Sequence, residues 1–151
     1  PHTHVICNRG VNGIDGSLSS AVGFAIGNPN QLTVLLIGDL SFFYDMNALC
    51  HTHLPHNLRV LLLNNGGGEI FRLLPGLGMN RETEKFVLAQ HQTTAEGWVK
   101  SLQAEYLAAH NMEEARNCMD QFFNPNGKFT LCEIFTQQES DKTIYEEIQK
   151  I

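Results

Sequence analysis

The stretch GDLSFFYDMNAL at residues 38–49, read together with NNGGG at residues 64–68, decides the fold of this chain. Each motif follows an apolar run, LTVLLI at residues 32–37 and LRVLLL at residues 58–63. Both runs are rich in leucine and β-branched residues and do not alternate with polar residues. This pattern predicts two parallel strands that are buried on both faces of a sheet.

The segment between the two predicted strands suits a short crossover helix. Residues 44–54 carry apolar side chains, among them Met46 and Leu49, at helical spacing. Strand, helix and strand then form a right-handed unit in which both strands run the same way. Their carboxyl ends lie about 4.8 Å apart if the strands pair directly. Open α/β sheets bind ligands at this edge, so we expect Asp39 and Asn65 to meet at a ligand site.

The side chains expected at this edge are oxygen donors beside glycines. Asp39 offers a carboxylate and Asn65 offers an amide oxygen. Hard oxygen ligands suit Mg²⁺, which takes few protein ligands and keeps the phosphates of its substrate in its shell. Gly38 and the glycine run at 66–68 let the backbone approach a ligand, because no Cβ intervenes, and a carbonyl of the run is available as a third ligand. The layout predicts a metal–diphosphate site.

Leu40 and Ser41 lie where the crossover begins. Their N–H groups can face a diphosphate as at a helix N-terminus, and the Ser41 hydroxyl can add a contact. Taken alone, Gly38–Asp39 could be a strand-end turn or a helix cap, and residues 64–66 could be a loop. The two motifs together, at the spacing of a strand–helix–strand unit, favour the ligand site.

Composition sets further expectations. A chain of 151 residues is long enough for one domain with a sizeable core. The formal net charge is −6, from 10 Lys and Arg against 16 Asp and Glu, and no basic patch is present, so we expect no nucleic-acid partner. An acidic domain needs a cation to hold an anionic diphosphate, which again favours Mg²⁺. No apolar run approaches the ~18 residues of a membrane span and no signal peptide is visible.

The cysteines and histidines carry weaker signals. The four cysteines are widely spaced and form no CxxC pair. Cys7 and Cys132 are expected in buried strands, as core residues of a protein in the reducing cytoplasm. Two HxH patterns, at residues 2–4 and 51–53, lack a third ligand, so a zinc site is a weak alternative.

The flanking segments complete the predicted layout. A strand is expected over residues 3–7, followed by a helix over residues 17–27 that Asp15 or Ser17 caps. Residues 72–96 have no long periodic pattern and are expected to form a loop that covers the ligand edge of the sheet.

The second half of the chain predicts further helices and a strand. Apolar residues at helical spacing predict a helix over residues 97–110, and Asn111 with Glu114 forms a capping box for a helix over residues 112–123. The remaining expected elements are a turn at 124–127, a strand at 128–135, and a closing helix with a stripe of Ile144, Ile148 and Ile151. Helices on both faces of a mainly parallel sheet make a doubly wound α/β fold in one domain over residues 1–151.

These motifs together resemble the thiamine-diphosphate enzymes. GD at residues 38–39 and NN at residues 64–65 are similar to the signature that binds the cofactor's diphosphate in that family. The longer stretches 8–27, 38–49 and 64–75 resemble the menaquinone-pathway synthases that make 2-succinyl-5-enolpyruvyl-6-hydroxy-3-cyclohexene-1-carboxylate. The resemblance implies thiamine diphosphate with Mg²⁺, or Mn²⁺, as cofactors. It also implies that the chain is the C-terminal diphosphate-binding domain of a three-domain enzyme.

The resemblance assigns roles to single residues at the cofactor. It implies that Asp39, Asn65 and the Gly67 carbonyl are the metal ligands. Ile14 is similar to the bulky residue that bends the cofactor into a V shape, and the Gly13 carbonyl would meet its aminopyrimidine. Ordinary core packing is the alternative role for Ile14.

Further residues resemble the family's substrate pocket. Arg9 would meet a substrate carboxylate in bidentate fashion, and Ile70 and Phe71 would line the pocket wall. The alternatives are a surface ion pair for Arg9 and plain packing for Phe71. Leu40 departs from the glycine that many family members carry at its position.

The implied reaction is decarboxylation of 2-oxoglutarate and addition of the succinyl unit to isochorismate. The activating glutamate would come from another subunit's N-terminal domain, so the resemblance implies a homo-oligomer and an inactive isolated chain. Two alternatives stay open: a thiamine-diphosphate enzyme with another acceptor, and a non-catalytic binding domain. NRGVNGIDG at residues 8–16 argues against the first, and the Asp39 and Asn65 pair argues against the second.

Overall fold

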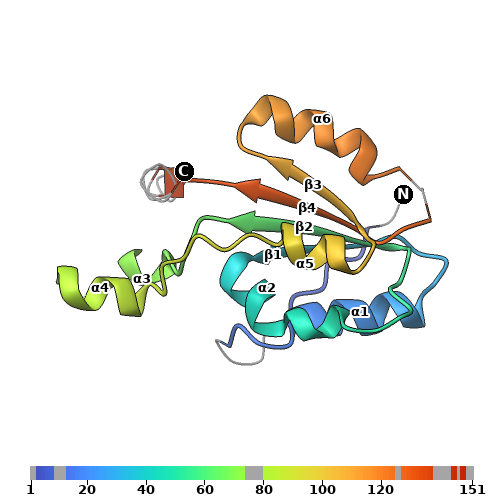
Figure 1. The fold of residues 1–151 in the computed structure, drawn as a ribbon, viewed down its shortest axis with the longest axis horizontal. Helices are drawn as coiled ribbons and strands as arrows, with labels where there is room; N and C mark the ends of the chain where they lie inside the picture. The colour runs from blue at the N-terminus through green and yellow to red at the C-terminus, as the bar shows by residue number, and fades with distance from the viewer. Residues whose placement is uncertain are drawn as a thin grey trace.

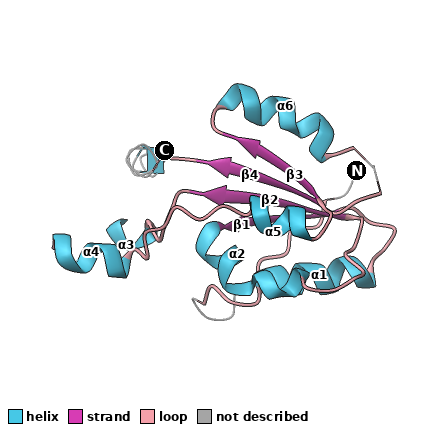
Figure 2. Cartoon of the chain, viewed as in Figure 1, coloured by secondary structure: helices cyan, strands magenta, loops and turns pink. Residues whose placement is uncertain are grey.

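The computed structural model describes residues 3–8, 13–73, 80–124, 127–137, 144–145 and 147–148. Within this part of the chain, four strands form one sheet in the order β1-β2-β4-β3, and each neighbouring pair is parallel. Figure 2 shows the arrows of β2, β4 and β3 pointing the same way. The strands are β1 Thr33–Gly38, β2 Leu58–Asn64, β3 Glu105–Ala109 and β4 Thr130–Phe135. The predicted α/β fold with a parallel sheet is confirmed.

Helices cover the sheet from two sides, as Figure 1 shows. One side carries α1 Ser17–Gly27, α2 Asp39–Asp45 with the 3₁₀ helix η1 Met46–Leu49, and α5 Glu96–Ser101. The other side carries α6 Met112–Phe122, which packs on β3 and β4. Two short helices, α3 Ile70–Leu73 and α4 Arg81–Val87, extend beyond the carboxyl ends of the strands. Among the described residues, no helix has the length and apolar character needed to cross a membrane.

The main core lies between the sheet and helices α1, α2 and α5. Leu58, Val60 and Leu62 alternate along β2 onto this face and are fully buried. Leu18 and Val22 of α1 are four residues apart, so they share one helix face and pack into the same cluster. This packing fixes α1 and α2 against the strands that lead to the ligand edge.

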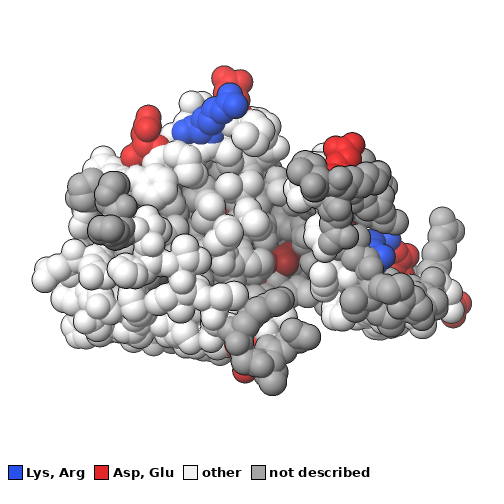
Figure 3. Space-filling model, turned by 180° about the vertical axis from the view of Figure 1, so that it is seen from behind, with Lys and Arg blue, Asp and Glu red and all other residues white. Residues whose placement is uncertain are grey.

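Strand β1 is an edge strand of the described sheet, and the prediction that it is buried on both faces is wrong. Val34 is 47% exposed and Leu36 is 64% exposed, because α6 covers only β3 and β4 on that side. Strand β2 has a neighbour on each side and is buried over most of its length, although Leu63 is 39% exposed. Seen from behind, the molecule presents a broad area free of charged side chains (Figure 3).

The predicted first strand is also wrong. Residues 3–8 form no strand, and Val5 and Ile6 are 90% and 70% exposed. Cys7, expected in a buried strand, is exposed, whereas Cys132 lies buried in β4 as predicted. An apolar run becomes a strand only when a neighbour supplies hydrogen bonds and a covering layer, and residues 3–8 have neither in the described structure.

Helix α1 has the predicted bounds but not the predicted cap. Its N-cap is Gly16 with a φ of 77°, and neither Asp15 nor Ser17 caps the helix end with its side chain. Asp45 of α2 supplies an acceptor to the first turn of α1, because the backbone N–H and the hydroxyl of Ser19 donate to Asp45 Oδ2 at 2.7 and 2.8 Å. The end of α2 therefore anchors the start of α1.

The crossover helix begins earlier than predicted. Helix α2 starts at Asp39, directly after β1, and passes into η1, which ends at Leu49. The predicted span of 44–54 is therefore wrong at both ends. Phe42 and Leu49 are fully buried in the core, and their packing explains why the helix forms over these residues.

The helix predicted over residues 97–110 is a helix followed by a strand. Helix α5 ends at Ser101, Gln103 adopts a left-handed φ of 57°, and β3 begins at Glu105. The helical spacing predicted one helix because Trp98 and Tyr106 both face the core. They pack on the same core cluster, but Trp98 does so from a helix and Tyr106 from a strand. Pairing with β4 decided between the two structures.

The predicted N-cap Asn111 of α6 is confirmed, but the predicted capping box is not, because the Glu114 carboxylate accepts the backbone N–H of His110 in place of that of Asn111. Asn111 Oδ1 accepts the Glu114 N–H at 2.9 Å. The Glu114 carboxylate in turn accepts the His110 N–H at 2.7 Å, and this bond lowers the pKa of Glu114. The strand predicted over residues 128–135 is confirmed as β4, whereas the tip of the turn before it, residues 125–126, lies outside the described residues.

Residues 72–96 are not a plain loop. They contain α4, whose N-cap Asn80 forms a capping box with Thr83. The segment after α4 returns to the ligand edge, because the Gly68 N–H donates to the Leu88 carbonyl at 2.7 Å. In the predicted closing helix, residues 144, 145, 147 and 148 are helical, but Ile144 and Ile148 are 52% and 62% exposed, so they form no packed stripe, and Ile151 lies outside the described residues.

Arg59 on β2 is 1% exposed and fastens the end of α6. Burial lowers the pKa of its guanidinium, yet every nitrogen finds a carbonyl partner. Its five acceptors are the carbonyls of Phe122, His56, Leu58, Lys128 and Asn124, at 2.6 to 3.1 Å. Phe122 is the last residue of α6, where helix carbonyls lack intrahelical partners, and Asn124 lies two residues beyond it.

We predict that Arg59→Met lowers the free energy of unfolding by about 3 kcal/mol, because it leaves several buried carbonyls without donors. Urea unfolding measures the change. The matched control is Arg116→Met on the exposed side of α6, which should change stability little. Equal losses in the two variants would contradict a fastening role for Arg59.

Glu133 on β4 is fully buried and accepts the Tyr106 hydroxyl at 2.6 Å. Burial and this carboxylate raise the pKa of Tyr106. The folded pKa lies above the unfolded value of about 10, so the stabilisation is complete below about pH 10 and is lost as the pH rises above it.

We therefore predict that urea unfolding midpoints fall more between about pH 8 and about pH 11 for the native chain than for Tyr106→Phe. Tyr44→Phe is the control, because Tyr44 is 67% exposed and should leave the native pH dependence unchanged. The same pH dependence in Tyr106→Phe as in the native chain would count against a buried phenol bound to Glu133.

Candidate functional site

The two predicted oxygen donors meet at one edge of the sheet. The register of β1 and β2 pairs Gly38 with Leu63, so both strands end together. The chain then reaches Asp39 on one side and Asn65 on the other. The Gly67 N–H lies 3.0 Å from Asp39 Oδ2 and 3.3 Å from Asn65 Oδ1. The parallel pairing of the strands therefore brings both side chains to the same turn.

The Asp39 carboxylate is 3% exposed and surrounded by donors. Oδ1 accepts the Leu40 N–H at 2.7 Å. Oδ2 accepts the N–H groups of Gly66 and Gly67 at 2.8 and 3.0 Å, and His91 Nε2 lies 3.1 Å away. Oδ2 therefore faces three of the four donors and Oδ1 accepts one, so Oδ2 is the more heavily bonded oxygen of the carboxylate.

The glycine turn needs its glycines for two separate reasons. Gly66 and Gly67 have φ values of 77° and 157°, which side chains disfavour, and this conformation turns both N–H groups toward Asp39. Gly68 is needed for space, because a Cβ there would lie 3.0 Å from the Phe71 ring and 3.3 Å from Leu40 Cδ1. The turn thus packs closely against α2 and α3.

Leu40 and Ser41 lie in the first turn of α2, where backbone N–H groups have no intrahelical partner. The Ser41 hydroxyl donates to the Ile14 carbonyl, so this contact brings the Gly13 and Ile14 segment to the start of α2. Gly13 is exposed and the Ile14 side chain is 47% exposed. Ile14 is therefore not part of the buried core in this chain.

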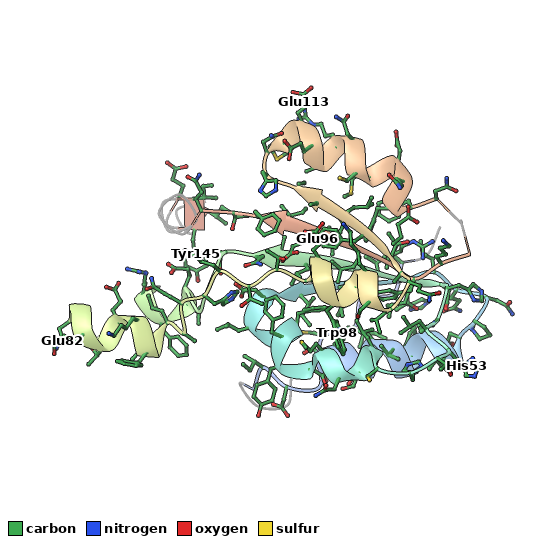
Figure 4. The ribbon with its side chains drawn as sticks, in the orientation of Figure 1. His53, Glu82, Glu96, Trp98, Glu113 and Tyr145 are labelled. Carbon is green, nitrogen blue, oxygen red and sulfur yellow. The ribbon has the colours of Figure 1, made fainter. Side chains whose placement is uncertain are left out.

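The predicted substrate residues are placed only in part. Ile70 and Phe71 lie on α3 beside the glycine turn and are 56% and 36% exposed. Arg9 lies outside the described residues. An open hollow of about 410 Å³ adjoins this edge and is lined by Asn65, Gly66, Gln90, His91 and Gln92. Another hollow, of about 390 Å³, includes His53 in its lining, and Figure 4 places this residue at the opposite end of the sheet.

His91 is a site residue that sequence reasoning missed. It lies 52 positions from Asp39 and reaches it because the segment after α4 folds back on the glycine turn. The His91 backbone N–H donates to the Gly66 carbonyl at 3.0 Å. The available signal in the sequence was a histidine within the segment expected to cover this edge.

The donor chemistry fits a hard cation. Asp39 Oδ2 and Asn65 Oδ1 both face the Gly67 N–H, so a partial positive charge already lies between two oxygens. A divalent cation bound by both oxygens would take the place of that N–H. The contacts of Gly67 with the two side chains are made by its N–H, and ligation by the Gly67 carbonyl stays a prediction.

Comparison with known proteins agrees with this geometry. The 2-succinyl-5-enolpyruvyl-6-hydroxy-3-cyclohexene-1-carboxylate synthase of Phocaeicola vulgatus is 45% identical over 149 residues, which are 97% of this chain and 27% of the relative. The synthases of that name from Bacteroides thetaiotaomicron and Christiangramia forsetii are 47% and 41% identical over 142 and 143 residues. These matches cover 93% and 94% of this chain and 25% of each relative, so the chain spans about a quarter of the length of these curated relatives.

A family model points to the same part of such enzymes. The model described as "Thiamine pyrophosphate enzyme, C-terminal TPP binding domain" matches residues 1–134, which is most of the chain. The matched region includes β1, β2, β3, all of β4 except Phe135, and both motifs of the ligand edge. The chain therefore belongs to the thiamine pyrophosphate enzyme family, as a C-terminal TPP binding domain.

Proposed function

We propose that this chain binds thiamine diphosphate and Mg²⁺ as the C-terminal domain of a menaquinone-pathway synthase. The whole enzyme would decarboxylate 2-oxoglutarate and add the succinyl unit to isochorismate. The main support for the proposed binding of Mg²⁺ and thiamine diphosphate is that oxygens of Asp39 and Asn65 both contact the Gly67 N–H. The shared name of the relatives and the NRGVNGIDG stretch at residues 8–16 support the substrate part.

The proposed metal ligands are Asp39, Asn65 and the Gly67 carbonyl, and Mn²⁺ could replace Mg²⁺. Gly38 lets the backbone approach the diphosphate, and the N–H groups of Leu40 and Ser41 face it from the first turn of α2. In this structure the Leu40 N–H donates to Asp39 Oδ1 at 2.7 Å, so it would have to exchange that carboxylate for the diphosphate. The bound cofactor supplies an electron sink for decarboxylation, and the protein supplies orientation and electrostatics.

The proposed contacts to the organic part of the cofactor come from the segment before α1. The Gly13 carbonyl would accept from the aminopyrimidine, and Ile14 would press against the cofactor. The Ser41 hydroxyl, held by the Ile14 carbonyl, links this segment to the diphosphate end of the site. Arg9 would bind a substrate carboxylate, with Ile70 and Phe71 as pocket wall.

We further propose that the chain is one domain of a three-domain, homo-oligomeric cytoplasmic enzyme. Val34 and Leu36 of β1 and Leu63 of β2 are exposed apolar side chains on the face that α6 leaves open. In a longer enzyme this face is suited to pack against another domain. The glutamate that activates the cofactor would come from a partner subunit, so the isolated chain would be inactive.

We predict that the chain binds thiamine diphosphate only when Mg²⁺ is present, as measured by calorimetric titration. Asp39→Ala should weaken this binding by more than tenfold, about 1.4 kcal/mol or more. The reason is that the variant removes the carboxylate that holds the cation. Asp120→Ala, at an exposed position on α6, is the charge-matched control and should bind as the native chain does. Unchanged binding in Asp39→Ala would argue against this metal site.

We predict that a full-length enzyme containing this chain forms 2-succinyl-5-enolpyruvyl-6-hydroxy-3-cyclohexene-1-carboxylate from 2-oxoglutarate and isochorismate. Mass spectrometry of the product provides the measurement, with thiamine diphosphate and Mg²⁺ present. Decarboxylation without consumption of isochorismate would point to another acceptor. The 151-residue chain alone should give no product.

A further inference from the structure

His91 contacts the carboxylate on which the proposed metal site depends. Its Nε2 lies 3.1 Å from Asp39 Oδ2, and its side chain is 16% exposed. The imidazole ring also packs edge-on against Phe43 of α2, with centroids 5.4 Å apart and planes at 89°. The ring is therefore held between α2 and the glycine turn.

A second hydrogen bond determines which nitrogen of His91 carries the proton. The Thr93 backbone N–H lies 3.1 Å from His91 Nδ1. A backbone N–H can only donate, so Nδ1 is the acceptor and Nε2 carries the ring proton. Nε2–H therefore donates to Asp39, and neither nitrogen has a lone pair directed at a metal.

The segment that carries His91 is bound to the end of β2. Asn64 Nδ2 donates to the Thr93 carbonyl at 2.9 Å, and Asn64 Oδ1 accepts the Gly66 N–H at 3.1 Å. Asn64 thus holds both the glycine turn and the segment opposite it. The contacts among Asp39, His91, Thr93, Asn64 and Gly66 form a closed ring of hydrogen bonds.

Glu133 connects this ring of hydrogen bonds to the centre of the sheet. Its Oε1 accepts Asn64 Nδ2 at 2.7 Å, and its Oε2 accepts the Ala95 N–H at 3.0 Å. The Tyr106 hydroxyl donates to the same Oε2 from β3. Glu133 is fully buried in β4, so its bonds tie the segment from Thr93 to Ala95 to the centre of the sheet.

We infer that His91 is a positioning residue for the metal ligand Asp39, an inference that rests on the proposed function. With a cation bound, the His91 Nε2–H would stay on Oδ2 and hold the Asp39 carboxylate in a fixed orientation toward the metal. Hydrogen bonds of this kind to a ligating carboxylate commonly decide metal affinity by about 10- to 100-fold.

The test compares His91→Leu with His91→Gln in the 151-residue chain. Mg²⁺ is titrated at a fixed concentration of thiamine diphosphate, and calorimetry reports the binding. His91→Leu should need about 10- to 100-fold more Mg²⁺, because Asp39 loses its donor. His91→Gln should restore most of the affinity, because its amide nitrogen can donate from the position of Nε2. Equal losses in both variants, or tighter binding in His91→Leu, would overturn the inference.

A second measurement needs no bound cofactor. Nitrogen-15 NMR of the histidine rings in the metal-free chain should show His91 with a protonated Nε2 and an unprotonated Nδ1. The opposite tautomer would overturn the inference even if the native chain bound thiamine diphosphate. If the native chain binds no thiamine diphosphate, the proposed function of the isolated chain fails, while the NMR result still decides the Asp39 contact.

The matched control is His53→Leu. His53 is exposed and lies at the end of the sheet opposite the site (Figure 4). This variant should keep both the native Mg²⁺ dependence and the His91 ring signals. A loss of affinity in His53→Leu equal to that in His91→Leu would indicate a general effect of removing a histidine and would refute the positioning role.

Discussion

The bonds from the glycine turn to the Asp39 carboxylate are the constraint on which the site depends. They tie the start of α2 to the turn after β2, through the N–H groups of Gly66 and Gly67. The contact exists only because β1 and β2 are parallel neighbours that end together. The contact places the Asp39 carboxylate close to the Asn65 amide oxygen in an acidic chain. Oxygen ligands of this kind suit a cation that bridges the protein to an anionic diphosphate.

Two buried charged side chains hold the sheet on which this constraint rests. Arg59, near the start of β2, binds carbonyls at the end of α6 and in the loops at that end of the sheet. Glu133, toward the end of β4, binds groups from β2, β3 and the segment before α5. Each satisfies several backbone or side-chain partners, so neither charge is left bare in the interior. The first stabilises the scaffold, and the second orders the residues that surround the site.

One face of the sheet is left partly uncovered and apolar. Helix α6 covers β3 and β4, but Val34 and Leu36 of β1 remain exposed. The chain spans about a quarter of the length of its curated relatives. An apolar edge strand beside the ligand edge is a natural surface for the rest of a longer enzyme.

Local patterns in the sequence were sufficient for α1, for the parallel pair β1 and β2, and for the meeting of Asp39 with Asn65. Apolar runs, glycines and caps act over short distances, so they can be read directly. Only the tertiary structure decided that Glu105–Ala109 is a strand, because pairing with β4 overrode helical spacing. Only the fold brought His91 to Asp39 across 52 positions. A contact of that range depends on how the whole chain closes, and no local pattern of residues encodes it.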